Sequence, residues 1–154
     1  MKVLDLCAAP GGKSMAAAMY MENWGEILSC DLHGGKLPQI DAAARRLGVG
    51  IVRAAENDAT VLREEFAGAF DAVIADVPCS GLGVIRKKPD IRYKDMASME
   101  RLPEIQQKIL RNAAAYVKPG GQFLAMKSVE SDGEIQRAKT AIETLGGRLR
   151  TCAD

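Results

Sequence analysis

The sequence contains few of the residues that build metal sites or disulfide frameworks. Its four cysteines are widely separated and form no Cys-x-x-Cys pair, and His33 is its only histidine. Structural zinc sites and disulfide-rich folds both need clusters of such residues. We therefore expect no metal site, and the unpaired cysteines favour the reducing environment of the cytoplasm.

A charge excess of one sign and a long apolar segment are also absent. The chain has 21 Lys and Arg against 20 Asp and Glu, so no overall attraction draws it to nucleic acid or to an anionic membrane. No run reaches the about 18 apolar residues of a membrane span, and the apolar start is broken at Pro10, too early for a signal peptide. We expect a soluble, unsecreted protein with no membrane partner.

What the sequence does contain is a regular alternation of strand-like and helical segments. Apolar runs bounded by turn residues predict strands at residues 3–7, 26–31, 50–54, 71–76 and 122–127. Helical spacing of apolar residues predicts helices at residues 13–21, 35–47, 103–117 and 134–145. This alternation is typical of an α/β fold with a doubly wound parallel sheet in a single domain, residues 1–154. Such sheets bind ligands beyond the carboxyl ends of their strands.

After the first predicted strand comes a turn of small residues, where backbone N–H groups and a helix N-terminus can approach a ligand. The turn consists of Cys7, Ala8, Ala9, Pro10, Gly11, Gly12 and Lys13. Ordinary strand-to-helix packing is one interpretation, and a P-loop-like nucleotide-binding protein is another, since residues 12–14 read GKS. The P-loop pattern needs a glycine where Cys7 stands, and Pro10 removes an amide from the phosphate cradle. The dinucleotide pattern GxGxxG is not matched.

Carboxylates at the ends of later strands favour a nucleoside ligand. Asp31 ends the second predicted strand about 20 residues after the turn, where a carboxylate can accept hydrogen bonds from both ribose hydroxyls. Asp58 follows the third strand and either faces an adenine amino group or lies in a solvated loop. His33 either borders the same ligand or is a solvated residue at a helix start.

Two longer motifs make a family resemblance specific. LDLCAAPGGKS resembles the first motif of Sun/Fmu-type 16S rRNA cytosine-5 methyltransferases. DVPCSGLGVIRKKPDIRY, with Asp76 to Gly83 followed by Pro89 and Asp90, resembles their fourth motif. The resemblance runs almost continuously over residues 3–123. It implies a Rossmann-like class I methyltransferase fold that uses S-adenosyl-L-methionine.

Carried over by position, the resemblance gives a role to each residue of the candidate site. Residues 7–13 would contact the methionine part and the sugar of the cofactor, Asp31 the ribose and Asp58 the adenine. Asp76 would lie where cofactor and base meet and would hydrogen-bond the Watson–Crick edge of cytosine. Pro78 would fix the backbone of that loop.

The resemblance also implies a covalent reaction. Cytosine C5 is a poor nucleophile, so its methylation needs a thiolate that first adds at C6. In the family the fourth-motif cysteine, matched by Cys79, assists product release, and a second cysteine after a PGG turn forms the covalent bond. Ser128 stands at that second position, and its hydroxyl is a much weaker nucleophile than a thiolate. We therefore expect weak or absent catalysis. For Cys79, the alternative to a catalytic role is that it is a buried small hydrophobic residue.

The last part of the chain resembles a different family. Residues 120–150 are similar to the final strand-helix-strand of a bacterial 16S rRNA guanine-N7 methyltransferase. With an abrupt start and the ending TCAD, this predicts a recombined, designed or truncated chain that lacks the usual closing antiparallel strand. Cys152 lies in a TC dipeptide too late in the chain to replace the missing nucleophile.

Cations that follow the fourth motif form a candidate contact surface for rRNA. Phosphates on either side of a target base could be held by Arg86, Lys87, Lys88 and Arg92. A solvated charge run is the alternative, since Tyr93 is the one aromatic residue among them. Family members usually carry an RNA-binding region before the core, so we expect weak rRNA binding by this segment alone.

These observations leave several hypotheses open. The chain is a cofactor-binding methyltransferase core with impaired catalysis, or an active enzyme that uses Cys79 as nucleophile or cysteine-free chemistry at guanine N7. It is otherwise a recombined chimera with no catalytic function. A P-loop-like nucleotide-binding protein is the remaining alternative.

Overall fold

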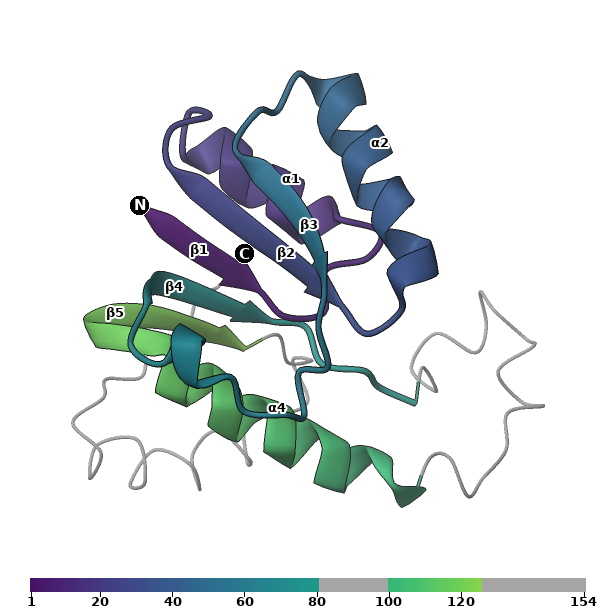
Figure 1. Ribbon diagram of the computed structural model, residues 1–154, viewed down its shortest axis with the longest axis vertical. Helices are drawn as coiled ribbons and strands as arrows, with labels where there is room; N and C mark the ends of the chain where they lie inside the picture. Colours follow the sequence, from purple (N-terminus) through teal and green to yellow (C-terminus); the bar gives the residue numbers. More distant parts are fainter. Residues whose placement is uncertain (81–99, 126–154) are drawn as a thin grey trace.

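The computed structural model describes residues 1–80 and 100–125, and these residues form a parallel sheet in the order β3-β2-β1-β4-β5. All arrowheads point toward the same edge (Figure 1). The central β1 pairs with β2 on one side and with β4 on the other. The chain thus builds outward from β1 to β3 and then returns to β1's free edge, which creates a topological switch point between β1 and β4. The strands are β1 (Lys2–Asp5), β2 (Glu26–Asp31), β3 (Val52–Glu56), β4 (Phe70–Ala75) and β5 (Val117–Ala125).

Local sequence signals start and stop the helices. The α-helices are α1 (Gly12–Tyr20), α2 (Leu37–Leu47) and α4 (Leu102–Tyr116), with short 3-10 turns η1 (Gly34–Lys36) and η2 (Glu64–Phe66). Both α2 and α4 have a proline in their first two positions, where the missing N–H costs no helical hydrogen bond. The helix α2 ends at Gly48, whose φ of 67° is the left-handed conformation that favours glycine.

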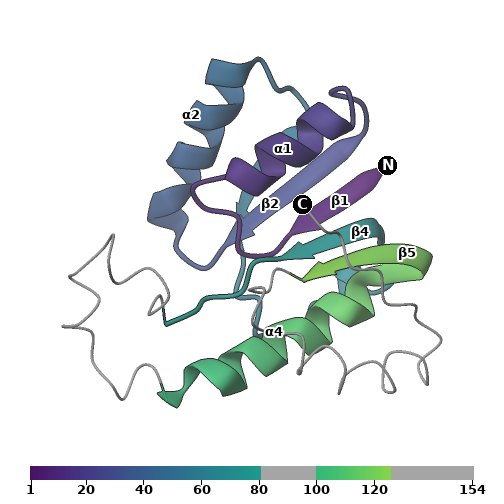
Figure 2. The same cartoon turned by 180° about the vertical axis from the view of Figure 1, so that it is seen from behind.

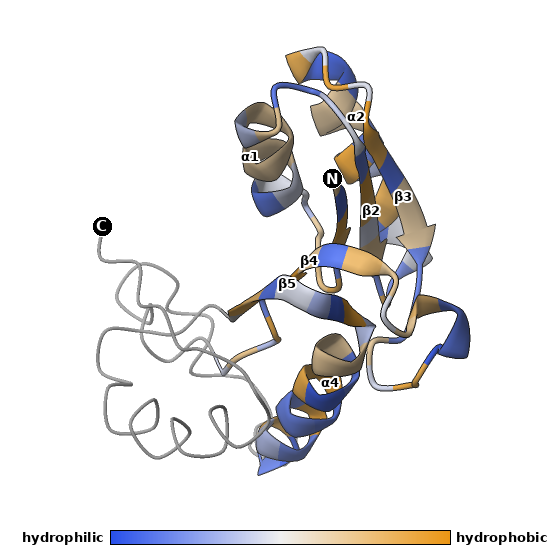
Figure 3. Ribbon diagram, turned by 90° about the vertical axis from the view of Figure 1, so that its left-hand side faces the viewer, coloured by the Kyte–Doolittle hydropathy of each residue, from blue (hydrophilic) through white to orange (hydrophobic). Residues whose placement is uncertain are grey.

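Alternate residues of the strands face opposite layers of the domain. Val3 and Ile74 pack with Ala18 of α1, whereas Leu4 and Val73 pack with residues of α4. In Figure 2 α1 and α2 lie on the near side of the sheet, and α1 crosses in front of β2. In Figure 3 α1 lies above β4 and β5, and α4 lies below them. The sheet is therefore covered on both faces, which confirms the doubly wound parallel architecture expected from the sequence.

The aromatic residues are concentrated in the layer that contains α4. Phe66 makes edge-to-face contacts with Phe70 and Tyr116 at centroid distances of 5.5 and 5.4 Å. Phe70 and Tyr116 are almost completely buried, and each such side chain stabilises the fold by roughly 2 kcal/mol. This cluster fixes α4 against β4 and the segment around η2.

The element bounds differ from the sequence predictions mainly at strand ends. The predicted strand at residues 26–31 matches β2, but β3 starts two residues later than expected, because the Gly50 amide bonds to the Asn23 side chain in a turn. The predicted start of the last strand at residue 122 was wrong, since β5 begins at Val117, directly after α4. The predicted helix at 134–145 and the proposed lack of a closing antiparallel strand lie outside the described residues.

The PGG turn lies within β5 instead of before it. Val117 pairs with Phe70 and Gln122 with Ala72, so the residues between them bulge from the ladder. Gly120 has a φ of 79°, and a Cβ on Gly121 would approach Asp71 O to 2.8 Å. The glycines thus make a bulge that lets one strand continue through the turn. Among the described helices, none has the length and apolar content to cross a membrane.

Candidate functional site

A hollow of about 220 Å³ lies at the switch point, beside the carboxyl ends of β1 and β4. It brings together the two sequence motifs, since six residues of the first loop line it together with the residue that directly follows β4. Its lining consists of Cys7, Ala8, Ala9, Pro10, Gly12, Lys13 and Asp76. The structure thus brings these predicted site residues together, and their proposed roles stay predictions.

The two adjacent glycines of the first loop have different roles. Gly11 has a φ of 105°, donates to Ala8 O and precedes α1, so it makes the turn itself. Gly12 lines the hollow, and a Cβ there would meet nothing within 4 Å. The missing side chain of Gly12 therefore leaves space for a ligand, whereas Gly11 supplies a backbone conformation that other residues rarely adopt.

A buried polar chain beneath the loop fixes the start of α1. Ser29 Oγ donates to Ser14 Oγ, and Ser14 Oγ donates to Asp5 Oδ2, each at 2.7 Å. All three side chains are fully buried. These hydrogen bonds connect β2, α1 and β1, and they were not foreseen from the sequence. The available signal was a carboxylate in an apolar strand followed nine residues later by a serine.

Burial also changes the acidity of Asp5. It raises the pKa of the Asp5 carboxyl from 3.8 to about 6, while the hydrogen bond from Ser14 and the Cys7 backbone amide act in the opposite direction. Asp5 Oδ1 is buried and has no hydrogen-bond partner among the described residues. A carboxylate in this setting is stabilised by the positive Lys13 and destabilised by Asp76.

An ion pair joins the two motifs across the sequence. Lys13 Nζ lies 2.5 Å from Asp76 Oδ2, and the two residues are 63 positions apart in the chain. Both side chains are about two fifths exposed, so the pair lies where the hollow meets solvent. The paired carboxylate and ammonium are held in place by each other and remain reachable by a ligand.

Asp31 lies beside the first loop but does not line the hollow. Its Oδ2 accepts a hydrogen bond from the Ala9 amide at 3.3 Å, and its Oδ1 accepts one from the His33 amide at 3.0 Å. The Lys36 ammonium lies 3.7 Å from Oδ1. The carboxylate is thus fixed next to Ala9 by backbone groups, and His33 contributes its amide to this arrangement.

Asp58 lies farther along the same edge of the sheet, after β3. Its Oδ1 accepts hydrogen bonds from the Thr60 amide and the Thr60 hydroxyl, at 2.9 and 2.7 Å. This local turn fixes the carboxylate without placing it in the hollow. Asp31 and Asp58 therefore follow β2 and β3 in the order expected for an elongated ligand lying across the strand ends.

The described cysteines fall into two groups. Burial raises the pKa values of Cys7 and Cys30 to about 12, and for Cys7 the carboxylates Asp5, Asp31 and Asp76 raise it further. Both remain thiols at neutral pH. Cys79 is exposed, which contradicts the interpretation of this residue as a buried small hydrophobe.

Several predicted site residues lie outside the described residues. These are Ser128, Arg86, Lys87, Lys88, Arg92, Tyr93, Pro89, Asp90 and Cys152. Their proposed roles stay predictions. Over residues 1–80 and 100–125, no group of three or more His, Cys, Asp or Glu side chains is arranged to hold a metal ion.

The strand order, the switch point and the loop that follows β1 define a class I S-adenosylmethionine methyltransferase fold. The solved structure of PH0851 superposes with a TM-score of 0.79 at 30% identity, covering 92% of this chain and 33% of that one. NSun6 from Pyrococcus horikoshii, solved with the S-adenosylmethionine analogue SFG, gives a TM-score of 0.70 at 26% identity over 92% of this chain and 38% of that one.

A model of the family described as 16S rRNA methyltransferase RsmB/F matches residues 1–144, and the chain belongs to this family. It is 50% identical over 139 residues to the probable ribosomal RNA small subunit methyltransferase B of Bacillus subtilis, covering 86% of this chain and 31% of that protein. It is 36% identical over 128 residues to the mouse 28S rRNA (cytosine-C(5))-methyltransferase, covering 80% of this chain and 16% of that protein. The chain thus spans about a third, or less, of these relatives' lengths. The resemblance of residues 120–150 to a guanine-N7 enzyme stays a prediction.

Proposed function

We propose that this chain binds S-adenosylmethionine and forms the catalytic core of a methyltransferase acting at C5 of cytosine in ribosomal RNA. The ion pair between Lys13 and Asp76 carries this proposal. It joins the loop that would hold the cofactor to the loop that would meet the base, and both residues line one hollow. The names of the relatives, which include rRNA methyltransferases of the small and large subunits, agree with this substrate class.

The charge around the hollow suits a sulfonium cation better than a phosphate. Asp5, Asp31 and Asp76 all disfavour the thiolate form of Cys7, which lines the hollow. A cationic methyl donor is stabilised by such a negative field, whereas the phosphates of a P-loop ligand are repelled. Lys13, the cation at the hollow, is already paired with Asp76. These observations support the methyl donor over a nucleoside triphosphate.

The first loop and the two later carboxylates would divide the cofactor between them. Residues 7–13 would hold the methionine part and the sugar, in the space that Gly12 leaves open. Asp31 would accept hydrogen bonds from the ribose hydroxyls, because a carboxylate offers about four acceptor positions and the backbone amides use only part of them. Asp58 would accept from the adenine amino group.

The loop after β4 would bind the target base. Bound S-adenosylmethionine supplies the methyl group. A nucleophile that adds to C6 of cytosine makes C5 reactive, and loss of the C5 proton to a base then lets the nucleophile leave. Asp76 would accept hydrogen bonds from the Watson–Crick edge, and Cys79 would assist the release step. We propose that Ser128, at the position of the covalent cysteine, makes this core slow.

Calorimetry and a gain-of-function variant test the proposal. We expect the chain to bind S-adenosylmethionine, and Ser128→Cys to increase radiolabelled methyl transfer to a 16S rRNA transcript at least tenfold. Adding Cys79→Ser to Ser128→Cys should trap a covalent protein–RNA product, because the release step is impaired. Absence of cofactor binding at millimolar concentration would reject the proposal, and so would an inert Ser128→Cys variant that binds cofactor normally.

A second route is favoured by the exposure of Cys79. It is the exposed member of the described cysteines, whereas Cys7 and Cys30 are held as thiols by burial. In this route Cys79 itself adds to C6, and Ser128 has no covalent role. Cys79→Ala in the otherwise unchanged chain would then abolish transfer, and Ser128→Ala would leave it unchanged.

A further inference from the structure

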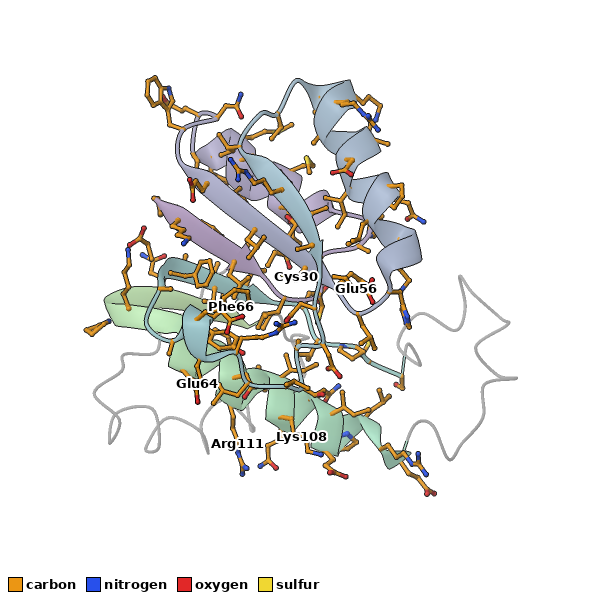
Figure 4. All side chains as sticks on the ribbon, in the orientation of Figure 1. Cys30, Glu56, Glu64, Phe66, Lys108 and Arg111 are labelled. Carbon is orange, nitrogen blue, oxygen red and sulfur yellow. The ribbon has the colours of Figure 1, made fainter. Side chains whose placement is uncertain are left out.

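The helix α4 contacts two loops of the proposed site, those after β3 and β4, through polar side chains. Gln106 Nε2 donates to Pro78 O at 2.8 Å, in the loop that carries Asp76 and Cys79. Asn112 Nδ2 donates to Ala59 O at 2.9 Å, in the loop that carries Asp58. Figure 4 shows Lys108 and Arg111 on the outward side of this helix, away from the sheet. The polar residues of α4 therefore divide into a solvated set and a set that bonds to site loops.

The contact with the loop after β3 is reinforced by Tyr116. Its hydroxyl accepts a hydrogen bond from the Arg63 amide at 2.8 Å and donates to Val61 O at 3.3 Å. The Tyr116 ring is fully buried, so its position is fixed by packing. Asn112 and Tyr116 on α4 thus bond to three backbone groups of this loop, which are the carbonyls of Ala59 and Val61 and the amide of Arg63.

These contacts act directly beside Asp58. Ala59 is its neighbour in the chain, and the Val61 amide donates to Asp58 O at 3.1 Å. Thr60, between the two α4-bonded carbonyls, makes both hydrogen bonds to Asp58 Oδ1. A shift of the Ala59 carbonyl would therefore move the turn that orients the Asp58 carboxylate.

The helix is also a rigid spacer between the two loops. Ile109 and Ala113 lie between the polar contacts and are buried in the same cluster as Val73 and Ala75 of β4. Gln106 and Asn112 are six positions apart, a rise of roughly 9 Å along a helix. The packed helix therefore sets the separation between the Pro78 and Ala59 carbonyls.

We propose that α4 positions the two halves of the site separately: Asn112 and Tyr116 set cofactor affinity through the Asp58 turn, and Gln106 sets the transfer step through the Pro78 loop. This inference rests on the proposed function, and it adds three positioning residues that would contact neither cofactor nor base. A helix with a purely structural role would affect both properties alike or neither.

The first test needs no activity. Hydrogen exchange of the ligand-free chain should show faster exchange over residues 57–63 in Asn112→Ala, and over residues 76–80 in Gln106→Ala. The matched control is Gln107→Ala, an exposed glutamine on the same helix, which should change neither segment. The inference would be overturned if either variant raised exchange equally in both segments, or if a variant raised it in neither segment.

The second test separates binding from transfer, in the Ser128→Cys background. We expect Asn112→Ala to weaken binding of S-adenosylhomocysteine about tenfold and to leave kcat at saturating cofactor within twofold. Gln106→Ala should leave the Kd for S-adenosylhomocysteine within twofold and lower kcat about tenfold. Gln106→Lys keeps a hydrogen-bond donor and should restore much of the lost kcat. Equal losses in both parameters would overturn the inference. A wild-type chain that binds no cofactor would instead reject the proposed function, while the exchange experiment still reports on the α4 contacts.

Discussion

Lys13 Nζ and Asp76 Oδ2 lie 2.5 Å apart and join the loop after β1 to the loop after β4. An equally exposed ion pair, Lys118 with Asp71 at 2.8 Å, lies at the amino end of β4. The two pairs have similar exposure and differ in their place on the sheet. They therefore allow the functional and structural effects of an ion pair to be separated.

Lys13→Met should lower methyl transfer at least a hundredfold in the Ser128→Cys background, because Asp76 loses the group that holds it at the hollow. Its free energy of unfolding should change by less than about 1 kcal/mol, since exposed ion pairs stabilise little. Lys118→Met should have a similarly small effect on stability and no effect on transfer. Urea unfolding and radiolabel transfer measure the two properties, and equal activities of the two variants would contradict the assignment.

The buried Asp5 should make stability depend on pH. Its pKa is about 6 in the folded chain against 3.8 as the ordinary value, so the folded state binds its proton more tightly than the unfolded state. The contribution of the protonated Asp5 carboxyl to the free energy of unfolding is complete below about pH 4 and is lost as pH rises through 6. The shift of about two units corresponds to roughly 3 kcal/mol.

Asp5→Asn should remove this component, so the difference in unfolding free energy between the wild type and the variant should change between pH 4 and 7. Asp41→Asn, an exposed position on α2, is the control and should keep the wild-type slope. Urea unfolding at several pH values measures both. Parallel stability curves for the wild type and Asp5→Asn would show that Asp5 does not titrate in this range.

The two glycines of the first loop should respond differently to alanine. Gly11→Ala should destabilise the fold by about 1–2 kcal/mol, because an L-residue is strained at a φ of 105°. Gly12→Ala meets open space and should leave stability unchanged or slightly higher, yet weaken S-adenosylmethionine binding at least tenfold by filling the hollow. Thermal unfolding and calorimetry distinguish these outcomes, and normal cofactor binding by Gly12→Ala would place the ligand elsewhere.

Cysteine reactivity should follow burial. With iodoacetamide at pH 8, Cys79 should be alkylated at least tenfold faster than Cys7 and Cys30, because only thiolates react and the pKa values of the latter two are raised to about 12. Peptide mass spectrometry resolves the three sites. Fast labelling of Cys7 in the folded chain would mean that the first loop opens readily.

Local patterns identified most of the described elements and the position of the first loop. The strand ending at Asp31 and the turn around Gly11 are encoded by contiguous apolar and small residues, so periodicity and turn chemistry identify them. The bulge in β5 was missed because PGG normally ends an element, and its place within the strand depends on pairing with β4.

Contacts between distant polar residues could not be predicted in this way. The hydrogen bond from Ser14 to Asp5 depends on how α1 packs on β1. Gln106 and Asn112 resemble a solvated helix face in the sequence, and only the tertiary arrangement shows that they bond to loop carbonyls. Hydrophobic periodicity predicts which face of a helix or strand is buried. It does not predict which distant backbone group will lie beside a polar side chain on that element.

The central position of β1 also bears on the order of assembly. Its pairing with β2 joins residues such as Lys2 and Glu26, whereas its pairing with β4 joins Val3 to Ala72, across a chain segment nearly three times as long. Contacts between closer residues close smaller loops at a lower entropic cost. The half containing Asp31 can therefore form before β4 docks, and the hollow exists only afterwards. A ligand that contacts the loops after both β1 and β4 would stabilise the fully folded state and not the intermediate in which β4 is undocked. Ligand binding would therefore shift the folding equilibrium toward the native state.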